Sequence, residues 1–364
     1  MGFAWKELLH EKKKYLLIEL VIILLMFMVL FLSGLVEGLS RSIISGIADM
    51  DADYFLLGDS SGKIITNSEI DQDTFRKLQT QTNSELAPLN IRRMFLSKQE
   101  DEEKLDVTYF VIEPGCFLEP DVWKGVQLSE TEAQNPIILN DSYLSEGIQL
   151  GDAVYDSSSG LEFQVIGFVK DKMYGHTSVG YISFDCYHKI NTLLNPAYQT
   201  VYHTVVLKGK DIGGIDLDGT LLISKSETVE HIPSYSIINL TITAIEWVLM
   251  AITAAIIGVF YYILTIQKRK QFGVMKAVGM GMGRITAIVA GQVGIVSAIG
   301  VILANLFTVA VSAALPATMP FYLKIENFCL VSFAFVLICI ASSLASVWHI
   351  SRVDPMKAIG GGEE

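Results

Sequence analysis

The chain has 364 residues, of which 51% are hydrophobic, and its mean hydropathy is +0.42. A composition this apolar excludes an ordinary soluble acidic protein and predicts a membrane protein. The formal net charge of −12 argues against a nucleic acid as the binding partner.

Four apolar stretches are long enough to cross a bilayer, which requires about 20 residues. They are residues 15–36, 237–266, 285–315 and 328–348. Three consecutive lysines precede the first stretch, as they would in a signal peptide. That stretch is too long for the apolar region of a signal peptide, and no small-x-small cleavage site follows it closely. We therefore expect it to be a retained membrane helix.

Lysine and arginine residues predict how the chain crosses the cell membrane. They gather before the first span, between the second and third, and after the fourth, whereas the short loop 316–327 holds only Lys324. Because positive charge marks the cytoplasmic side, we expect both termini in the cytoplasm and a large acidic domain outside. The predicted order is N-terminus with first span (1–38), external domain (39–235), second span (236–266), cytoplasmic coupling segment (267–284), third span (285–315), external loop (316–327), fourth span (328–349) and cytoplasmic tail (350–364).

The external segment predicts an α+β domain, so the expected fold is four transmembrane helices with a large α+β domain between the first two. A helix is expected around residues 74–80. Short stretches bounded by glycine, aspartate and proline predict strands at 107–112, 162–169, 204–207 and 220–223. The four cysteines show neither Cys-x-x-Cys nor zinc-site spacing, although Cys116 and Cys186, both external, could pair.

Polar residues inside the spans are informative, because a carboxylate at membrane depth is costly unless it faces protein or a cavity. On the first span, Glu19 and Glu37 are five helical turns apart and share one face. Gly34 and Gly38, beside Glu37, would permit close helix approach. Four residues of the second span share a face: Tyr235, Asn239, Ile242 and Glu246. These patterns fit either structural pairing between helices or a polar path or ligand site.

The basic segment 267–283 lies between two apolar spans and carries apolar residues at helical spacing: Phe272, Met275, Val278 and Met282. It predicts a short amphipathic helix that lies on a membrane or in a partner's groove, or else a basic loop that only fixes topology. The glycine-rich run 279–286 lacks the Gly-Lys-Ser/Thr ending of a phosphate-binding loop. We therefore do not expect the chain to hydrolyse ATP.

This layout resembles the FtsX/MacB-type permeases of ABC transporters. Residues 267–279 are similar to that family's cytoplasmic motif of a charged run, glycine, a hydrophobic pair, Lys-Ala and glycine, and residues 353–360 to its closing Pro-x-x-Ala motif. The resemblance implies a non-enzymatic permease that forms a homodimer, in which each copy binds an ABC ATPase. The residues it assigns to ATPase coupling are Phe272, Gly273, Met275, Lys276, Ala277 and Gly279.

Segments 170–178, 262–268, 315–323 and 358–361 resemble the members of this family that export haem from Gram-positive bacteria and so detoxify it. The resemblance implies haem as the substrate, bound within the membrane at the dimer interface, and no cofactor of the permease itself. Ferric iron accepts Tyr, His, Met or carboxylate ligands, and haem propionates favour Arg or Lys. The candidate haem residues are Tyr174, Tyr235, Glu37, Met26, Met173, His176 and, for a propionate, Arg41.

Two other classes of function use the same mechanical design and remain open. One is extraction of lipids or lipoproteins, or efflux of a drug or peptide. The other is signalling, in which the permease relays ATPase closure to an external cell-wall hydrolase. Residues 173–176 offer iron ligands that signalling would not need, which favours transport of haem.

Overall fold

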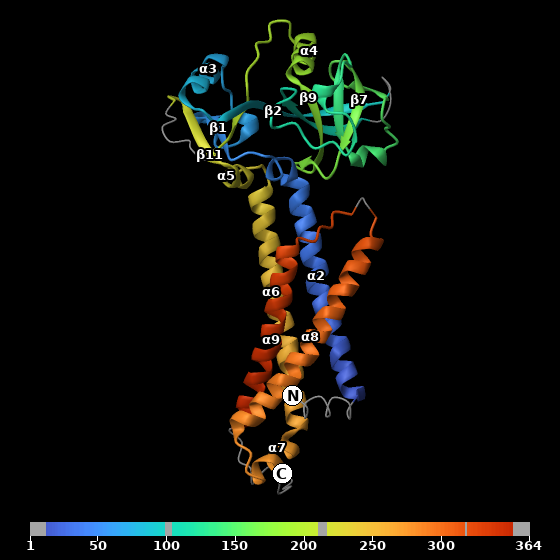
Figure 1. The fold of residues 1–364 in the computed structure, drawn as a ribbon, viewed down its shortest axis with the longest axis vertical. Coiled ribbons are helices and arrows are strands. Elements are labelled where there is room, and N and C mark those ends of the chain that lie inside the picture. Colours follow the sequence, from blue (N-terminus) through green and yellow to red (C-terminus); the bar gives the residue numbers. More distant parts are fainter. Residues whose placement is uncertain (1–11, 99–103, 210–216, 317–318, 352–364) are drawn as a thin grey trace. The chain divides into compact units, whose positions relative to one another are not determined.

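The computed structural model describes residues 12–98, 104–209, 217–316 and 319–351 (Figure 1). The chain divides into a helical unit, Met1–Gly38 with Thr241–Glu364, and a sheet unit, Leu39–Leu240. Four helices are long and apolar enough to cross a membrane, and an α+β domain lies between the first and second in the sequence. The expected fold class is therefore confirmed. The predicted tail motif at 353–360 lies outside the described residues.

The four long helices are α2 (Lys12–Ala48), α6 (Tyr235–Gln267), α8 (Met282–Ala314) and α9 (Ile325–Ser351). A shorter helix, α7 (Arg269–Ala277), occupies the coupling segment. None of the chain's prolines falls inside these helices, and Pro316 follows α8 closely. Since a residue before proline favours an extended backbone, Leu315, at ψ 144°, ends α8.

Apolar side chains from α2, α6, α8 and α9 form the core of the helical unit. Met26 and Leu30 of α2 are fully buried there, as are Phe335 and Cys339 of α9. The α2 helix continues past the predicted end of the first span, residue 36, to Ala48. Its last turns, from Leu39 onward, belong to the sheet unit.

The sheet unit is built on one mixed sheet of eleven strands. The strand order is β11-β1-β10-β2-β3-β9-β5-β7-β4. Outside this order, β6 pairs with β2 and β7, and β8 pairs with β9. The β3–β9 and β5–β7 pairs are parallel and the others antiparallel. The strands are β1 (Tyr54–Gly58), β2 (Glu85–Ser97), β3 (Leu105–Ile112), β4 (Lys124–Gly125), β5 (Pro136–Asn140), β6 (Ala153–Asp156), β7 (Glu162–Val169), β8 (Met173–Tyr174), β9 (Thr177–Ser183), β10 (Thr204–Lys208) and β11 (Thr220–Ser224).

Three helices accompany the sheet: α3 (Gln72–Gln81), α4 (Phe184–Leu194) and α5 (Lys225–Glu230). Each begins after a side chain that accepts a backbone N–H, in turn Asp71, Ser183 and Ser224, which satisfies a donor that the first helical turn leaves free. The Thr74 N–H, which donates to the Asp71 carboxylate, also lowers the pKa of Asp71.

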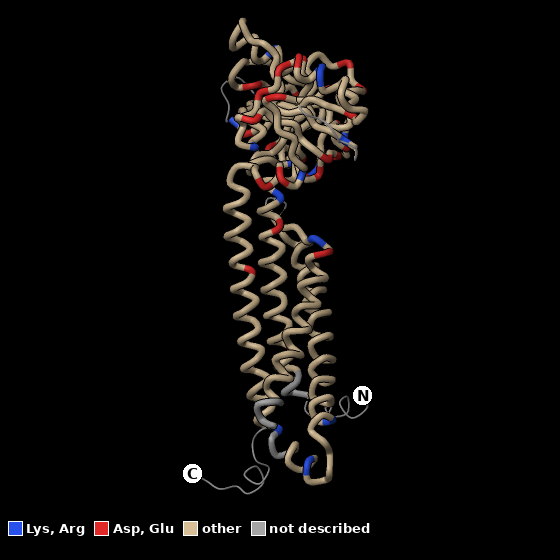
Figure 2. Tube along the Cα trace, turned by 90° about the vertical axis from the view of Figure 1, so that its left-hand side faces the viewer, with Lys and Arg blue, Asp and Glu red and all other residues tan. Residues whose placement is uncertain are grey.

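Charged residues are dense over the sheet unit and sparse along the long helices, as Figure 2 shows. The acidic character of the sequence therefore comes mainly from the sheet unit. Cys116 and Cys186 are free thiols that pack in separate apolar clusters of this unit. The possible disulfide between them is not present.

Candidate functional site

In the sheet unit, candidate haem residues gather on a hairpin formed by β8 and β9. This hairpin packs on the last turns of α2, where the Gly175 N–H donates to the Ile43 carbonyl at 3.0 Å and the His176 N–H to the Ser42 carbonyl at 3.0 Å. The Met173 N–H donates to Ser45 Oγ at 2.9 Å. These bonds hold three candidate residues, Met173, Tyr174 and His176, against one face of α2.

Local backbone geometry explains this contact. His176 has a φ of 66°, which turns the hairpin sharply, and its Nδ1 lies 3.0 Å from Ser42 Oγ. A Cβ at Gly46 would lie 2.9 Å from the Phe110 ring and 3.0 Å from the Met173 carbonyl. Glycine at this position therefore lets α2 approach the hairpin closely.

Tyr174 points into the core of the sheet unit. It is 8% exposed, and its ring meets Phe110 edge-on at 5.8 Å between centroids. Burial raises the pKa of Tyr174, which disfavours the phenolate form that would bind ferric iron. In this arrangement Tyr174 is a packing residue, and contact with iron would require the hairpin to leave α2.

An ion cluster surrounds Arg41, the candidate propionate contact. Arg41 Nη2 lies 2.5 Å from Asp49 Oδ2, and Lys172 Nζ lies 3.6 Å from the same oxygen. Tyr235 begins α6 and packs, half-buried, against the cluster that also contains Ile43 and Tyr174. The sheet unit thus brings five of the seven candidate haem residues to one region around the end of α2.

In the helical unit, a second group of polar residues surrounds Glu37. The Asn327 amide donates to Glu37 Oε2 at 3.4 Å, and Glu246 of α6 faces Ser33 and Glu37 of α2. A small pocket adjoins this group and is lined by Glu37, Ser33 and Lys324 among others. Two carboxylates predicted on separate spans therefore lie near one another within one chain.

The two glycines beside Glu37 do allow a close approach, but the segment that approaches is the loop before α9. A Cβ at Gly38 would collide with the Pro320 carbonyl, and one at Gly34 would lie 2.5 Å from the Phe321 ring. The Tyr322 N–H donates to the Gly34 carbonyl at 3.0 Å. Within the chain, these glycines position the loop that carries Lys324 and leads to Asn327.

Met26 and Glu19 lie deeper in the helical unit. Met26 is fully buried in the apolar core, so iron could reach it only if helices parted. Glu19 Oε1 is buried and has no hydrogen-bond partner within the described part of the chain, and it would lie 3.3 Å from a Cβ built at Gly300 of α8. Among the described residues, no three His, Cys, Asp or Glu side chains form a metal-binding group.

The coupling segment is a helix whose apolar residues point in two directions. Phe272 packs against the core of the helical unit, and Gly273 is buried. Val274 and Val278 are 60% and 83% exposed. The predicted stripe is thus divided, and exposed Val274 is a candidate contact that the spacing of the larger residues did not indicate.

Gly279 ends α7. Its φ is 91°, its N–H donates to the Lys276 carbonyl at 2.9 Å, and the Met280 N–H donates to the Met275 carbonyl at 3.0 Å. This is the Schellman pattern of helix termination, which favours glycine because the backbone is left-handed. The geometry thus gives Gly279 a structural role within the segment.

Some polar residues of these regions were absent from the sequence-based candidates. Glu246 was placed on one helical face with Tyr235 but was not assigned as a haem ligand. Asn327 had no signal in the sequence, because its contact with Glu37 joins residues that are remote in the sequence. Gln292, buried on α8, is a polar residue in an apolar run, which could have marked it.

The chain is similar to known proteins along its whole length. Residues 244–355 match the family described as FtsX-like permease C-terminal, so the chain contains an FtsX-like permease domain. It is 26% identical over 363 residues to the "Putative hemin transport system permease protein HrtB" of Staphylococcus haemolyticus, and both chains are covered completely. The protein of the same name from Staphylococcus epidermidis is 26% identical over 367 residues, again with complete coverage of both chains.

Among solved structures, the extracellular domain of the noncanonic ABC-type transporter YknZ from Gram-positive bacteria shows a slight likeness. The TM-score is 0.31 and the identity 16%, with 44% of this chain and 84% of that chain covered.

Proposed function

We propose that this chain, a permease of the ABC type, exports haem from the cell membrane with ATP hydrolysed by a partner ATPase of the HrtA type. The observation that carries the proposal is that Glu37 of α2 and Glu246 of α6 lie near one another, on helices long and apolar enough to cross a membrane. Carboxylates in a membrane interior mark substrate paths, because burying them without a function is costly. The full-length similarity to hemin transport permeases supports haem as the substrate.

Haem suits this part of the chain chemically. It is a flat, apolar molecule that partitions into lipid, and ferric iron accepts carboxylate and phenolate ligands. Tyr235 and Glu246 are three helical turns apart on the same face of α6, and Glu37 of α2 lies near Glu246. In our proposal Glu37 of the helical unit and Tyr235 of the sheet unit each serve as an iron ligand, and Arg41 leaves Asp49 to bind a propionate.

The hairpin residues take part at a later stage of the proposed export. Hydrogen bonds from the backbone of the hairpin hold Met173, Tyr174 and His176 on α2, and burial raises the pKa of Tyr174. Movement of α2 would break those bonds and expose soft and phenolic ligands. We propose that they then receive haem on its way out, and that Met26 is reached only when the helices part.

ATP hydrolysis by the partner would act through α7. Val274 and Val278 offer an exposed apolar face for the ATPase, with Met275, Lys276 and Ala277 between them, while Phe272 joins α7 to the helical core. A push on α7 would thus reach α8 and α2. In this proposal two permease copies form the transporter, both termini and α7 are cytoplasmic, and the sheet unit is extracellular.

Visible spectra with added hemin test the proposal. We would purify the permease with its ATPase and compare Tyr235→Phe, Glu37→Ala, Glu246→Ala and their combination with wild type. The matched control is Glu326→Ala, whose side chain is 83% exposed. The combined variant should lose the hemin spectrum, haem-stimulated ATPase activity and growth on hemin, while the control keeps all three.

Two results would contradict the proposal in different ways. If the combined variant keeps the wild-type spectrum and full hemin tolerance, the site is misplaced. If wild type itself shows no spectral change with hemin, haem is the wrong substrate, and efflux of another amphiphile or signalling takes its place.

A further inference from the structure

Lys268 is the residue at which α6 ends and the coupling helix α7 begins. Its N–H donates to the Leu264 carbonyl at 3.2 Å, as the next residue of α6 would. Its carbonyl accepts the Phe272 N–H at 3.0 Å, which forms the first turn of α7. Its ψ of 1° departs from the helical value of about −42°, so the chain bends at this residue. The backbone of Lys268 thus sets the direction in which α7 leaves α6.

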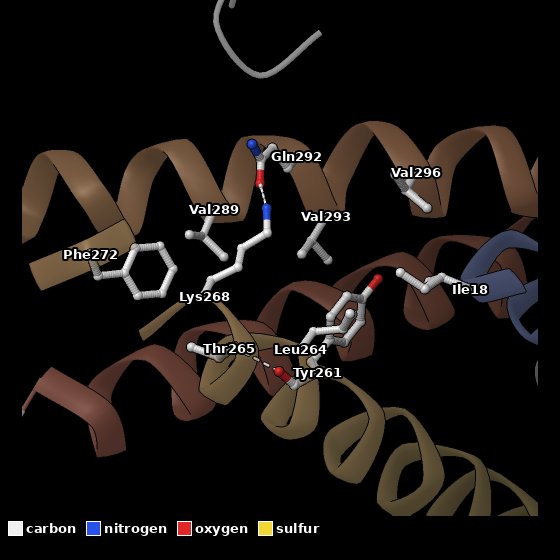
Figure 3. A pocket seen from close by; sticks show the side chains of 10 residues that line it. All are labelled: Ile18, Tyr261, Leu264, Thr265, Lys268, Phe272, Val289, Gln292, Val293 and Val296. Carbon is white, nitrogen blue, oxygen red and sulfur yellow. Dashed lines mark hydrogen bonds between the residues drawn. The ribbon is translucent and has the colours of Figure 1, made fainter. Parts of the chain in front are cut away.

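The side chain of Lys268 reaches a third helix. Its Nζ donates to Gln292 Oε1 of α8 at 3.3 Å (Figure 3). Gln292 is only 4% exposed, and a buried amide is costly unless it is hydrogen-bonded. Lys268 is the one charged residue among the described residues around this contact. The bend between α6 and α7 is thus tied to the interior of α8.

An apolar contact accompanies this polar one. Phe272, one turn after Lys268, and Val289, one turn before Gln292, line the same small space (Figure 3). Residues three or four apart share a helical face, so the start of α7 meets one face of α8 at two points. The side chains leave a cavity of about 30 Å³, far below the roughly 300 Å³ of the smallest typical ligand pockets. The contact is therefore a packed joint between helices.

We infer that Lys268 and Gln292 are positioning residues that fix the angle of α7 against α8. Apolar packing at Phe272 has no preferred direction, whereas a hydrogen bond does, so the polar pair sets an orientation that the apolar pair alone would leave free. The inference rests on the proposed function in one respect: when the ATPase moves α7, the joint passes that movement to α8. Without the pair, α7 would turn by itself and ATP hydrolysis would not move the span.

Hydrogen–deuterium exchange of the full chain, purified without its ATPase, tests the joint. Gln292→Leu removes the acceptor and nearly keeps the volume. It should make the α7 amides exchange about tenfold faster, the population change expected for one charge-assisted hydrogen bond. Lys268→Met should do the same, whereas Lys268→Arg keeps a donor and should exchange as wild type does. Gln267→Leu is the matched control, because it makes the same chemical change at an exposed residue beside the joint.

Lys268→Met combined with Gln292→Leu separates positioning from stability. Replacing both partners by apolar side chains of similar shape is nearly neutral for stability, so thermal unfolding of this double variant should match that of wild type. Its α7 amides should nevertheless exchange about tenfold faster, because the directional contact is gone. Wild-type exchange in the double variant would show that the bond only satisfies a buried amide, and would overturn the inference.

Export by the complex provides a readout that a merely structural role would not move. The double variant should copurify with the ATPase and hydrolyse ATP, because Val274 and Val278 are unchanged, while the hemin exported per ATP falls about tenfold. Unchanged export per ATP would overturn the inference. If wild type neither binds the ATPase nor exports hemin, the proposed function fails, and the exchange measurements still decide whether Lys268 and Gln292 hold α7.

Discussion

Two carboxylates, one in each unit, show how the surroundings change the meaning of a buried acid. In the sheet unit, Asp156 is fully buried and accepts four hydrogen bonds, from the Tyr109 hydroxyl, the N–H groups of Ser158 and Ser159, and the Ser159 hydroxyl. In the helical unit, Glu37 is half-buried and, among the described residues, accepts one long bond, from Asn327. A fully paired carboxylate stabilises its fold, whereas an incompletely paired one in an apolar setting is open to a ligand.

Asp156→Ala tests the structural side of this comparison and should have the largest effect. Removing the carboxylate leaves four donors without their acceptor in a dry interior, which should cost about 4 kcal/mol of unfolding free energy. Thermal unfolding of the purified chain measures it. Asp73→Ala is the control, since the Asp73 side chain is 80% exposed and should change stability little. An equally small effect of both variants would refute the structural role of Asp156.

The coupling helix tests whether the helical unit uses its exposed residues for binding. Val274→Asp together with Val278→Asp should lower affinity for the ATPase about a hundredfold, because a contact would bury unpaired charge. Copurification of the two subunits reports this loss. Phe272→Ala serves as the contrast: it should destabilise the helical core while the subunits still copurify. The opposite pattern would assign the contact to Phe272.

His203 should make the stability of the sheet unit depend on pH. Burial, with the nearby Arg92 charge, lowers the pKa of His203 to about 4, and its Nδ1 accepts the Ile91 N–H at 3.1 Å. In the unfolded chain His203 therefore takes up a proton near pH 6.5, whereas in the folded chain it stays neutral until the pH falls to about 4. Stability is complete above pH 6.5 and should fall by about 3 kcal/mol as the pH drops to 4.

Unfolding measured at several pH values tests this dependence. His203→Gln keeps an acceptor for the Ile91 N–H but does not titrate, so its stability should vary less between pH 6.5 and 4. If wild type and His203→Gln lose stability in parallel, another group is responsible.

Gly38→Ala tests the contact between α2 and the loop before α9. An added Cβ would collide with the Pro320 backbone, so the loop must shift, at a cost of about 2 kcal/mol. Gly291→Ala on α8 is the control, because no atom outside its own helix lies within 4 Å of the added Cβ. Alanine should stabilise that helix slightly. A thermal shift of the same sign for both variants would contradict the contact.

Tyr174→Phe should have the smallest effect on stability. The ring still packs on Phe110, and we expect a change below about 0.5 kcal/mol in thermal unfolding. Phe110→Ala is the contrast, since it empties the fully buried position that Tyr174 packs against. A large loss from Tyr174→Phe would show that the hydroxyl itself is required by the fold.

Local patterns in the sequence determined the architecture. The apolar stretches have the length of membrane helices, and the stretch predicted as a strand at 162–169 is β7, while 74–80 lies within α3. Such predictions succeed because hydrophobic runs and turn residues act over a few neighbouring positions. The sequence also placed Tyr235 and Glu246 on one face of a helix, which follows from its repeat alone.

The tertiary structure determines which neighbours each helical face and side chain contacts. Helical spacing marked Phe272 and Val278 as one stripe, yet Phe272 packs inward and Val278 is exposed, because α8 covers one side of α7. Tyr174 was marked by its chemistry, but Phe110 buries it. Glu37 and Asn327 meet although they are remote in the chain. Periodicity tells which side chains share a face; only the packing of distant segments determines whether that face is core, cavity or open surface.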